Sequence, residues 1–129
     1  MLDAYSLNQA ITAGNDIHLN VKKLETGKTV TLNGSTINLN VPGIYNVEVH
    51  ATGSTTENGT FGIQLYTKGQ PIERTLALAG TATGVKTSLS IKTLLAVANT
   101  NYGTSNFTIR NIGSSGTVDV VEVVVTKIR

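Results

Sequence analysis

The chain ends in the stretch VDVVEVVVTKIR, residues 118–129, and this stretch decides the fold class. A β-strand shows its side chains to two faces in alternation, so a half-buried strand should alternate apolar with polar residues. Here both faces would be apolar. One face would carry Val118, Val120 and Val124 with Glu122 among them, and the other would carry Val121, Val123 and Val125. Because both faces of the strand are apolar, each of them needs a cover.

The preceding sequence reads as a series of short strands separated by turn signals. Asn33-Gly34 is a strong hairpin signal between apolar runs at 30–32 and 37–39. Further alternating runs predict strands at 17–21, 44–51, 61–65, 72–78, 85–97 and 107–109, and the polar segments 80–84 and 99–105 predict loops. No amphipathic helix is indicated. We therefore predict an antiparallel β-sandwich of about nine or ten strands in one domain, 1–129, with residues 1–15 as an N-terminal arm or an edge strand.

Composition narrows the classes of function. The chain of 129 residues is 40% hydrophobic and 14% charged, which is typical of a globular domain and not of a disordered one. The net charge is only +2, Lys22-Lys23 is the one adjacent basic pair, and aromatic residues make up 5%, so nucleic-acid binding is not expected. The absence of cysteine excludes disulfides and thiolate metal sites. The N-terminus lacks the pattern of a signal peptide and no apolar run is long enough to span a membrane, so we expect synthesis in the cytoplasm and no membrane insertion.

Three stretches resemble a known family. They are TINLNVPGIYNVEVHATG from residue 36, FGIQLYTKGQPI from residue 61 and NFTIRNIGSSGTVDVVEVVVTKIR from residue 106. Together they resemble the superfamily of the complement-type globular head and tumour necrosis factor, over roughly residues 29–129. The resemblance implies a ten-stranded jelly roll that assembles as a homotrimer, with Pro42, Gly43 and Tyr45 as its core signature and Tyr45 in the core. A collagen-like stalk and most aromatic residues of the animal members are missing, which favours a microbial or bacteriophage version.

The trimer that this resemblance implies offers a cover for the second face of the last strand. One face would fill the sandwich core, and we predict that Val121, Val123 and Val125 line the trimer interface together with Glu122. An exposed ladder of valines would otherwise be prone to aggregation. A strand covered by two layers of the same chain is the alternative. If Glu122 is buried, it needs a cationic partner such as Lys92, Arg110 or Lys127.

Residues with catalytic or metal-binding chemistry are few. The loop GTATGVKT at 80–87 has the wrong spacing for a phosphate loop and leads into a strand. His50 with Glu48 and His18 with Asp16 each offer one imidazole and one carboxylate, which is too little for a metal site without repetition around an axis. No Ser/His/Asp arrangement can be argued from two histidines. We therefore expect no enzymatic activity, no metal and no cofactor.

These observations favour a structural protein of a bacteriophage particle, such as a head decoration, a head fibre or a tail-fibre tip. Its expected partners are its own copies, other virion proteins and, through loops, a glycan of the host surface. The candidate ligand loop contains Tyr102 with Asn99 and Asn101, since a tyrosine among amides can stack on a sugar and hydrogen-bond it. The alternative function is a carbohydrate-binding β-sandwich that uses Tyr102 or Tyr66.

Overall fold

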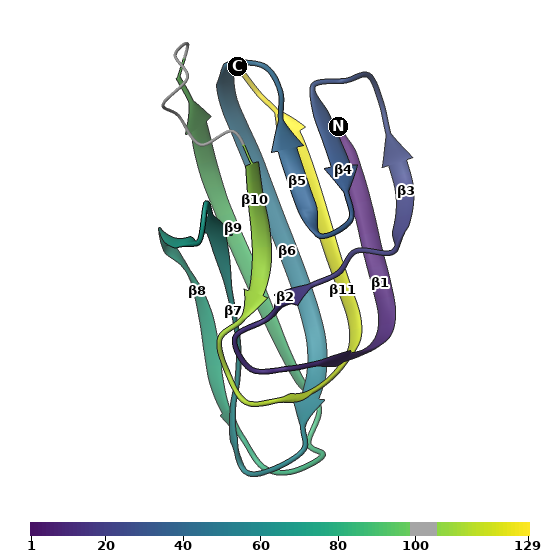
Figure 1. Cartoon of the computed structure of the whole chain (residues 1–129), viewed down its shortest axis with the longest axis vertical. Coiled ribbons are helices and arrows are strands. Elements are labelled where there is room, and N and C mark those ends of the chain that lie inside the picture. The colour runs from purple at the N-terminus through teal and green to yellow at the C-terminus, as the bar shows by residue number, and fades with distance from the viewer. Residues whose placement is uncertain (99–105) are drawn as a thin grey trace.

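The structure, a computed structural model, describes residues 1–98 and 106–129 (Figure 1). These residues form eleven β-strands and no helix. The strands are β1 (Leu2–Ile11), β2 (Asp16–Ile17), β3 (Val21–Glu25), β4 (Val30–Asn33), β5 (Thr36–Leu39), β6 (Gly43–Thr55), β7 (Gly59–Thr67), β8 (Gln70–Thr81), β9 (Thr87–Val97), β10 (Asn106–Asn111) and β11 (Gly116–Lys127).

The strands pack as two antiparallel sheets, which confirms the predicted sandwich. Sheet I has the order β3-β1-β11-β6-β9, and sheet II has the order β4-β5-β10-β7-β8 with the short β2 paired to β10. The single strand expected at 17–21 is instead divided between β2 and β3, because the chain passes from sheet II to sheet I over these residues. This division raises the strand number above the nine or ten expected.

The N-terminal segment is neither an arm nor an edge strand. β1 lies inside sheet I, with β11 on one side and β3 on the other. Its side chains alternate, so that Leu2, Ala4 and Ser6 are buried against sheet II. Short alternating segments with small residues predict a strand, but they do not say where in a sheet the strand lies.

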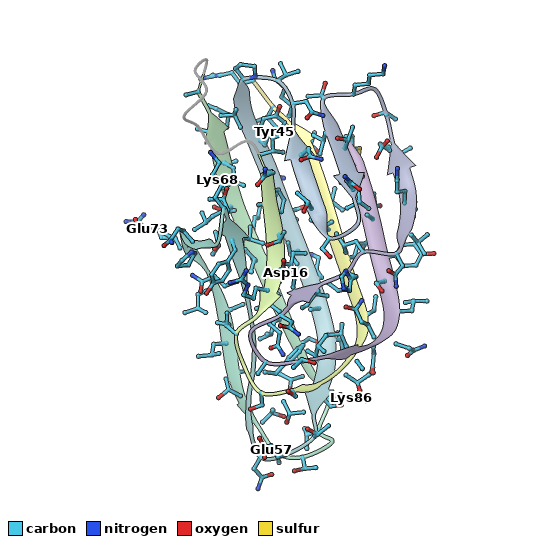
Figure 2. The ribbon with its side chains drawn as sticks, in the orientation of Figure 1. Asp16, Tyr45, Glu57, Lys68, Glu73 and Lys86 are labelled. Atoms are coloured by element: carbon cyan, nitrogen blue, oxygen red, sulfur yellow. The ribbon has the colours of Figure 1, made fainter. Side chains whose placement is uncertain are left out.

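The core lies between the sheets and takes every second side chain of most strands. Its largest fully buried side chains are Tyr45, Phe61 and Phe107. Tyr45 lies on β6 in sheet I, and its hydroxyl donates a hydrogen bond to the backbone carbonyl of Val41 (Figure 2). This bond satisfies the one polar atom of a ring that is otherwise surrounded by apolar side chains.

The chain enters β6 through Gly43, and the backbone at this position accepts no residue other than glycine. Its φ of +151° lies in a region that favours glycine. A Cβ atom at this position would also lie 2.3 Å from the carbonyl oxygen of Arg129. The backbone of Ile44 pairs with the same C-terminal segment, since its amide donates to Arg129 at 3.0 Å. The Pro-Gly pair therefore allows the start of β6 to pack closely against the end of the chain.

Two hairpins show how local sequence sets the turns. In the β4–β5 hairpin Asn33 pairs with Thr36, so the central residues are Gly34 and Ser35 and only Gly34 has positive φ. That pattern belongs to a type II′ turn instead of the I′ turn that Asn-Gly most often forms. In the β7–β8 hairpin both central residues, Lys68 and Gly69, have positive φ, as in a type I′ turn.

A bulge in β11 changes which of its valines share a face. The pairing with β6 shifts between Val118 and Val120, so Asp119 is an extra residue in β11. The alternation changes parity there: Val118 points inward before the bulge and Val121 points inward after it. Asp119 forms an ion pair with Lys86 at 2.7 Å, on the outside of the sandwich.

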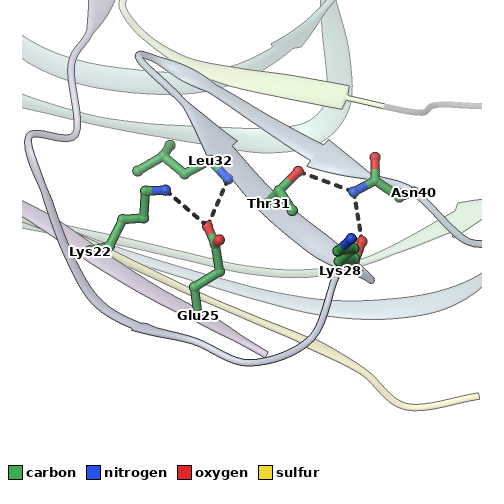
Figure 3. A network of polar contacts seen from close by, with 6 residues as sticks. All are labelled: Lys22, Glu25, Lys28, Thr31, Leu32 and Asn40. Carbon is green, nitrogen blue, oxygen red and sulfur yellow. Dashed lines mark hydrogen bonds and ion pairs between the residues drawn. The ribbon is translucent and has the colours of Figure 1, made fainter.

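Polar contacts close the side of the sandwich where β3 and β4 are the edge strands (Figure 3). The carboxylate of Glu25 lies 3.5 Å from Lys22 Nζ and accepts a hydrogen bond of 3.2 Å from the amide of Leu32, which joins β3 to β4. The side-chain amide of Asn40 donates to the carbonyl of Lys28 at 2.8 Å and to Thr31 Oγ1 at 3.0 Å. The Glu25 bond links the edges of the two sheets, and the Asn40 bonds hold the start of β4 beside the end of β5.

The opposite side is formed by β8 and β9, and β8 carries a wide bulge. Residues 72–75 lie opposite the single residue Leu65 of β7, so β8 has three extra residues here, and Arg74 adopts a positive φ of 62°. Thr75 is fully buried and fills the gap in the ladder: its hydroxyl accepts from the amide of Leu65 at 3.3 Å and donates to the carbonyl of Ile72 at 2.6 Å. Figure 2 shows Glu73 projecting away from the sandwich at this bulge.

Replacing Thr75 by valine is expected to lower the free energy of unfolding by about 2 kcal/mol, because the buried amide of Leu65 loses its hydrogen-bond partner. Urea unfolding followed by circular dichroism measures this change. The matched control is Thr12→Val, at an exposed position outside the strands, where less than about 0.5 kcal/mol is expected. Equal losses in the two variants would contradict the role given to the hydroxyl.

Candidate assembly surface

The structure corrects the predicted trimer interface. Val121, Val123 and Val125 are 0% exposed because they face sheet II in the chain's own core. They cannot form contacts with another copy. The error comes from the bulge at Asp119, which reverses the parity expected for an uninterrupted strand. The outward-facing residues of β11 are Val120, Glu122 and Val124, so only Glu122 of the predicted set lies on an outer surface.

The outer surface of sheet I carries exposed apolar side chains among its polar ones. We call it the outer face of sheet I, and its apolar members include Leu7 of β1 and Val120 of β11, which are 55% and 37% exposed. Leu7 and Val120 are directly opposite each other in the ladder. Two further apolar side chains, Val21 and Leu24 of β3, extend the face beyond β1. The exposed apolar pair of Leu7 and Val120 makes this face a candidate contact surface.

A row of charged groups crosses the middle of this face. Asp3 of β1 lies opposite Val124, and Val124 lies opposite Glu48 of β6. In the neighbouring row Glu122 lies opposite His50. Lys92 of β9 contacts Glu48 at 3.6 Å, and Lys23 of β3 contacts Asp3 at 3.8 Å. The row therefore joins all five strands of sheet I.

Among the described residues, no ion pair joins Glu122 to Lys92, Arg110 or Lys127, the partners expected from the sequence. Lys92 pairs with Glu48, and Arg110 lies in sheet II, where its Nε donates to Asp16 at 3.1 Å. Contact with the side chain of Asp3 is the main cause that raises the pKa of Glu122 above its usual value, and burial and the negative charge of Asp3 add to it. Lys23 and His50 act in the opposite direction. The main neighbour of Glu122 is thus another carboxyl group.

A second apolar surface lies on the side formed by β8 and β9. Leu76 and Leu78 of β8 are each 54% exposed and point away from the core on sheet II. Leu94 of the adjacent β9 lies on the sheet I side of the same border. We call these three residues the leucine edge. The contacts between β8 and β9 place all of them along one side of the sandwich (Figure 1).

The paired histidines and carboxylates do not form a metal centre in the part of the chain that the structure describes, where no three His, Cys, Asp or Glu side chains gather. Glu48 is engaged by Lys92, and Asp16 by Arg110. His18 Nδ1 shares a hydrogen bond with the hydroxyl of Ser35. These polar pairs link neighbouring segments at the surface.

The predicted ligand residues give little support to a sugar site. Tyr102, Asn99 and Asn101 lie outside the described residues. The ring of Tyr66 is covered by Arg110, whose guanidinium carbon lies 4.1 Å from the ring centroid. That face of Tyr66 is therefore not open for stacking on a sugar. No helix in the described residues is long and apolar enough to cross a membrane.

Comparison with known proteins identifies the fold. No protein-family model and no curated protein matches the sequence. The globular domain of zebrafish complement 1qA protein superposes with a TM-score of 0.65 at 11% identity, over 95% of this chain and 94% of that one. Eiger TNF from S. frugiperda gives a TM-score of 0.66 at 10% identity, over 98% and 92%. The phage PRD1 vertex protein P5 gives 0.59 at 14% identity, over 99% and 96%. At such identities the likeness shows the fold, a jelly roll of the C1q and TNF type.

Proposed function

We propose that this chain is a non-enzymatic structural module of a bacteriophage particle and that it works as a homotrimer. The observation that carries the proposal is the pair of apolar surfaces, the outer face of sheet I and the leucine edge. The similarity of the fold to a phage vertex protein supports a role in a phage particle, and the similarity to C1q and TNF domains supports self-association.

The two surfaces differ in shape and position, and this difference favours a ring. A two-fold dimer joins one patch to an identical patch, whereas an edge that packs on a face makes a head-to-tail contact. Such contacts close into a ring when the rotation between copies closes, and the family resemblance implies three copies. In that ring the leucine edge of each copy would cover Leu7 and Val120 of the next. Burying each apolar surface then contributes about 25 cal/mol of association free energy per Å² of apolar area, before the costs of association are subtracted.

Within a particle, the module would act as a head decoration, a head-fibre tip or a tail-fibre tip. It would be made in the host cytoplasm and displayed on the outside of the virion, next to other virion proteins. Contact with a host glycan would use the loops between strands. Three weak sites held on one rigid trimer would bind together with an avidity that a single loop lacks.

Val120→Glu tests the trimer. In wild type, sedimentation equilibrium should give three times the 13.6 kDa mass of one chain. The variant should remain folded, since Val120 is 37% exposed and lies between Leu7 and Thr52. Its trimer should dissociate at least roughly 100-fold more readily, because an unpaired charge at a covered interface costs about 3 kcal/mol or more.

Val85→Glu is the matched control, because Val85 is 52% exposed in the β8–β9 loop and lies outside both surfaces. It should assemble like wild type. A wild-type protein that stays at the mass of one chain would contradict the trimer.

The place of the chain in a phage particle has its own test. An antibody against the chain should label intact virions of the phage that encodes it, and labelling of free protein alone would contradict a virion role.

A further inference from the structure

Asp3 and Glu122 form a carboxyl pair on the outer face of sheet I. In the β1–β11 ladder Asp3 lies opposite Val124 and Tyr5 lies opposite Glu122, so the two acidic side chains are diagonal neighbours on the same side of the sheet. Asp3 Oδ1 is buried and has no hydrogen-bond donor among the described residues. A buried carboxylate oxygen without a donor is costly.

The charged groups around this pair leave it short of cations. From β3, Lys23 lies 3.8 Å from Asp3 Oδ2, the other oxygen of that carboxylate. From β6, His50 faces Glu122 directly, and Glu48 is paired with Lys92 of β9. With a neutral His50, the row holds three carboxylates against two lysines. One negative charge on the face therefore lacks a partner.

We propose that Asp3 and Glu122 share one proton in the assembled trimer, so that acid strengthens assembly. This inference rests on the proposed function, in which a neighbouring copy covers the outer face of sheet I. The proton comes from solvent to the carboxyl of Glu122, which then donates a hydrogen bond to Asp3 Oδ1. One negative charge remains on the pair, and Lys23 lies beside it.

Assembly should couple to this proton because a neighbouring copy removes water from the pair. Two adjacent carboxylates repel each other, and the loss of water makes the doubly charged state less favourable. The pKa of Glu122 is already raised in the single chain by Asp3 and by burial, so covering the face should raise it further. A trimer that binds more protons than its separated chains is favoured as pH falls.

His50 is the other ionisable side chain that faces Glu122, and its effect can be separated. Protonated His50 beside Glu122 would favour the carboxylate and so oppose proton sharing. If the carboxyl pair is the sensor, His50→Gln should keep the acid-strengthened assembly. If the variant loses the pH dependence, the histidine is the sensor and the proposal is overturned.

The test is sedimentation equilibrium between pH 5 and pH 7.5 at constant ionic strength, with wild type, Glu122→Gln and Glu57→Gln. For wild type, the trimer should tighten at least roughly tenfold toward the acidic end, the change that a shift of one pKa unit allows. Glu122→Gln carries an amide that donates to Asp3 at every pH, so it should assemble tightly with a much flatter pH dependence. Glu57→Gln, in the exposed β6–β7 loop, should follow wild type.

The outcomes separate the two proposals. If all proteins stay monomeric at every pH, the trimer fails and this inference fails with it. If wild type forms trimers with the same pH dependence as Glu122→Gln, the trimer stands and proton sharing is overturned. Assembly that weakens in acid would mean that a cation of the neighbouring copy pairs with the carboxylates, which also overturns the proposal.

A second measurement uses only the wild-type protein and does not depend on the folding of a variant. Carbon-13 NMR of the side-chain carboxyl groups reports the titration of Asp3 and Glu122 directly. In the trimer, the midpoint of Glu122 should lie above the ordinary glutamate value of 4.5. A midpoint at or below this value would overturn the shared proton.

Discussion

Val123→Glu is expected to prevent the chain from folding, whereas Val120→Glu is expected to leave it folded. The two residues lie on the same strand, and the same charge is introduced. Val123 is 0% exposed between the sheets, and Val120 is 37% exposed on the outer face of sheet I. In the core, β1 and β6 offer Val123 only Ala4 and Val49 as direct neighbours.

The size of the effect follows from burial without a partner. A charged carboxylate among apolar side chains either stays ionised at great cost or takes up a proton. Either way, we expect the free energy of unfolding to fall by more than about 4 kcal/mol, which is enough to unfold a domain whose stability lies near the lower end of the usual range of roughly 5–15 kcal/mol. Circular dichroism and amide NMR dispersion at neutral pH measure the outcome.

Val123→Ala serves as the milder control, because it removes apolar volume without adding a charge. It should fold with a smaller loss of stability, of the order of 2 kcal/mol. A folded Val123→Glu that is merely monomeric would show that Val123 lies at an interface after all, and that the parity change at Asp119 is absent in solution.

The strand content of this fold is readable from sequence because it depends on local pattern. Alternation predicts β6, β7 and β9, and Asn33-Gly34 predicts the hairpin around Gly34. These are properties that a few neighbouring residues determine. The position of Tyr45 in the core is what the family resemblance implies, and its burial confirms it.

The face assignment of β11 could not be read in the same way. One extra residue reverses which valines point inward, and periodicity alone does not reveal it. An acidic residue inside an apolar run, Asp119, was the available signal. Its partner Lys86 comes from a distant part of the sequence. On the neighbouring strand β1, Asn8 has a positive φ, and this too is a property of the folded chain.

The surroundings of Glu122 depend on strand order, which is a non-local property. The sequence offered several lysines and arginines as partners, and charge alone could not choose among them. Because β1 lies beside β11, Asp3 becomes its main neighbour. A contact between two acidic groups is the one arrangement that a search for opposite charges cannot predict.

Gly116→Ala is the second large effect that we expect, and it tests how closely the two central strands of sheet I approach. Gly116 begins β11 and is paired with Thr55 of β6. A Cβ atom there would lie 2.0 Å from the carbonyl oxygen of Ser54 and 2.8 Å from the Cα of Thr55. Both are backbone atoms, so no side chain can turn aside to make room.

The strands would have to separate at the position where β11 enters sheet I, and we expect a loss of about 3 kcal/mol in the free energy of unfolding. Gly80→Ala is the matched control: a Cβ at Gly80 meets nothing within 4 Å, and its φ is not positive. It should change stability by less than about 0.5 kcal/mol. Denaturant unfolding of both variants decides the matter. A Gly116→Ala protein as stable as wild type would mean that β6 and β11 can move apart here without cost. Their continuous pairing beyond the bulge, from Val120 opposite Thr52 to Lys127 opposite Tyr45, argues against such freedom.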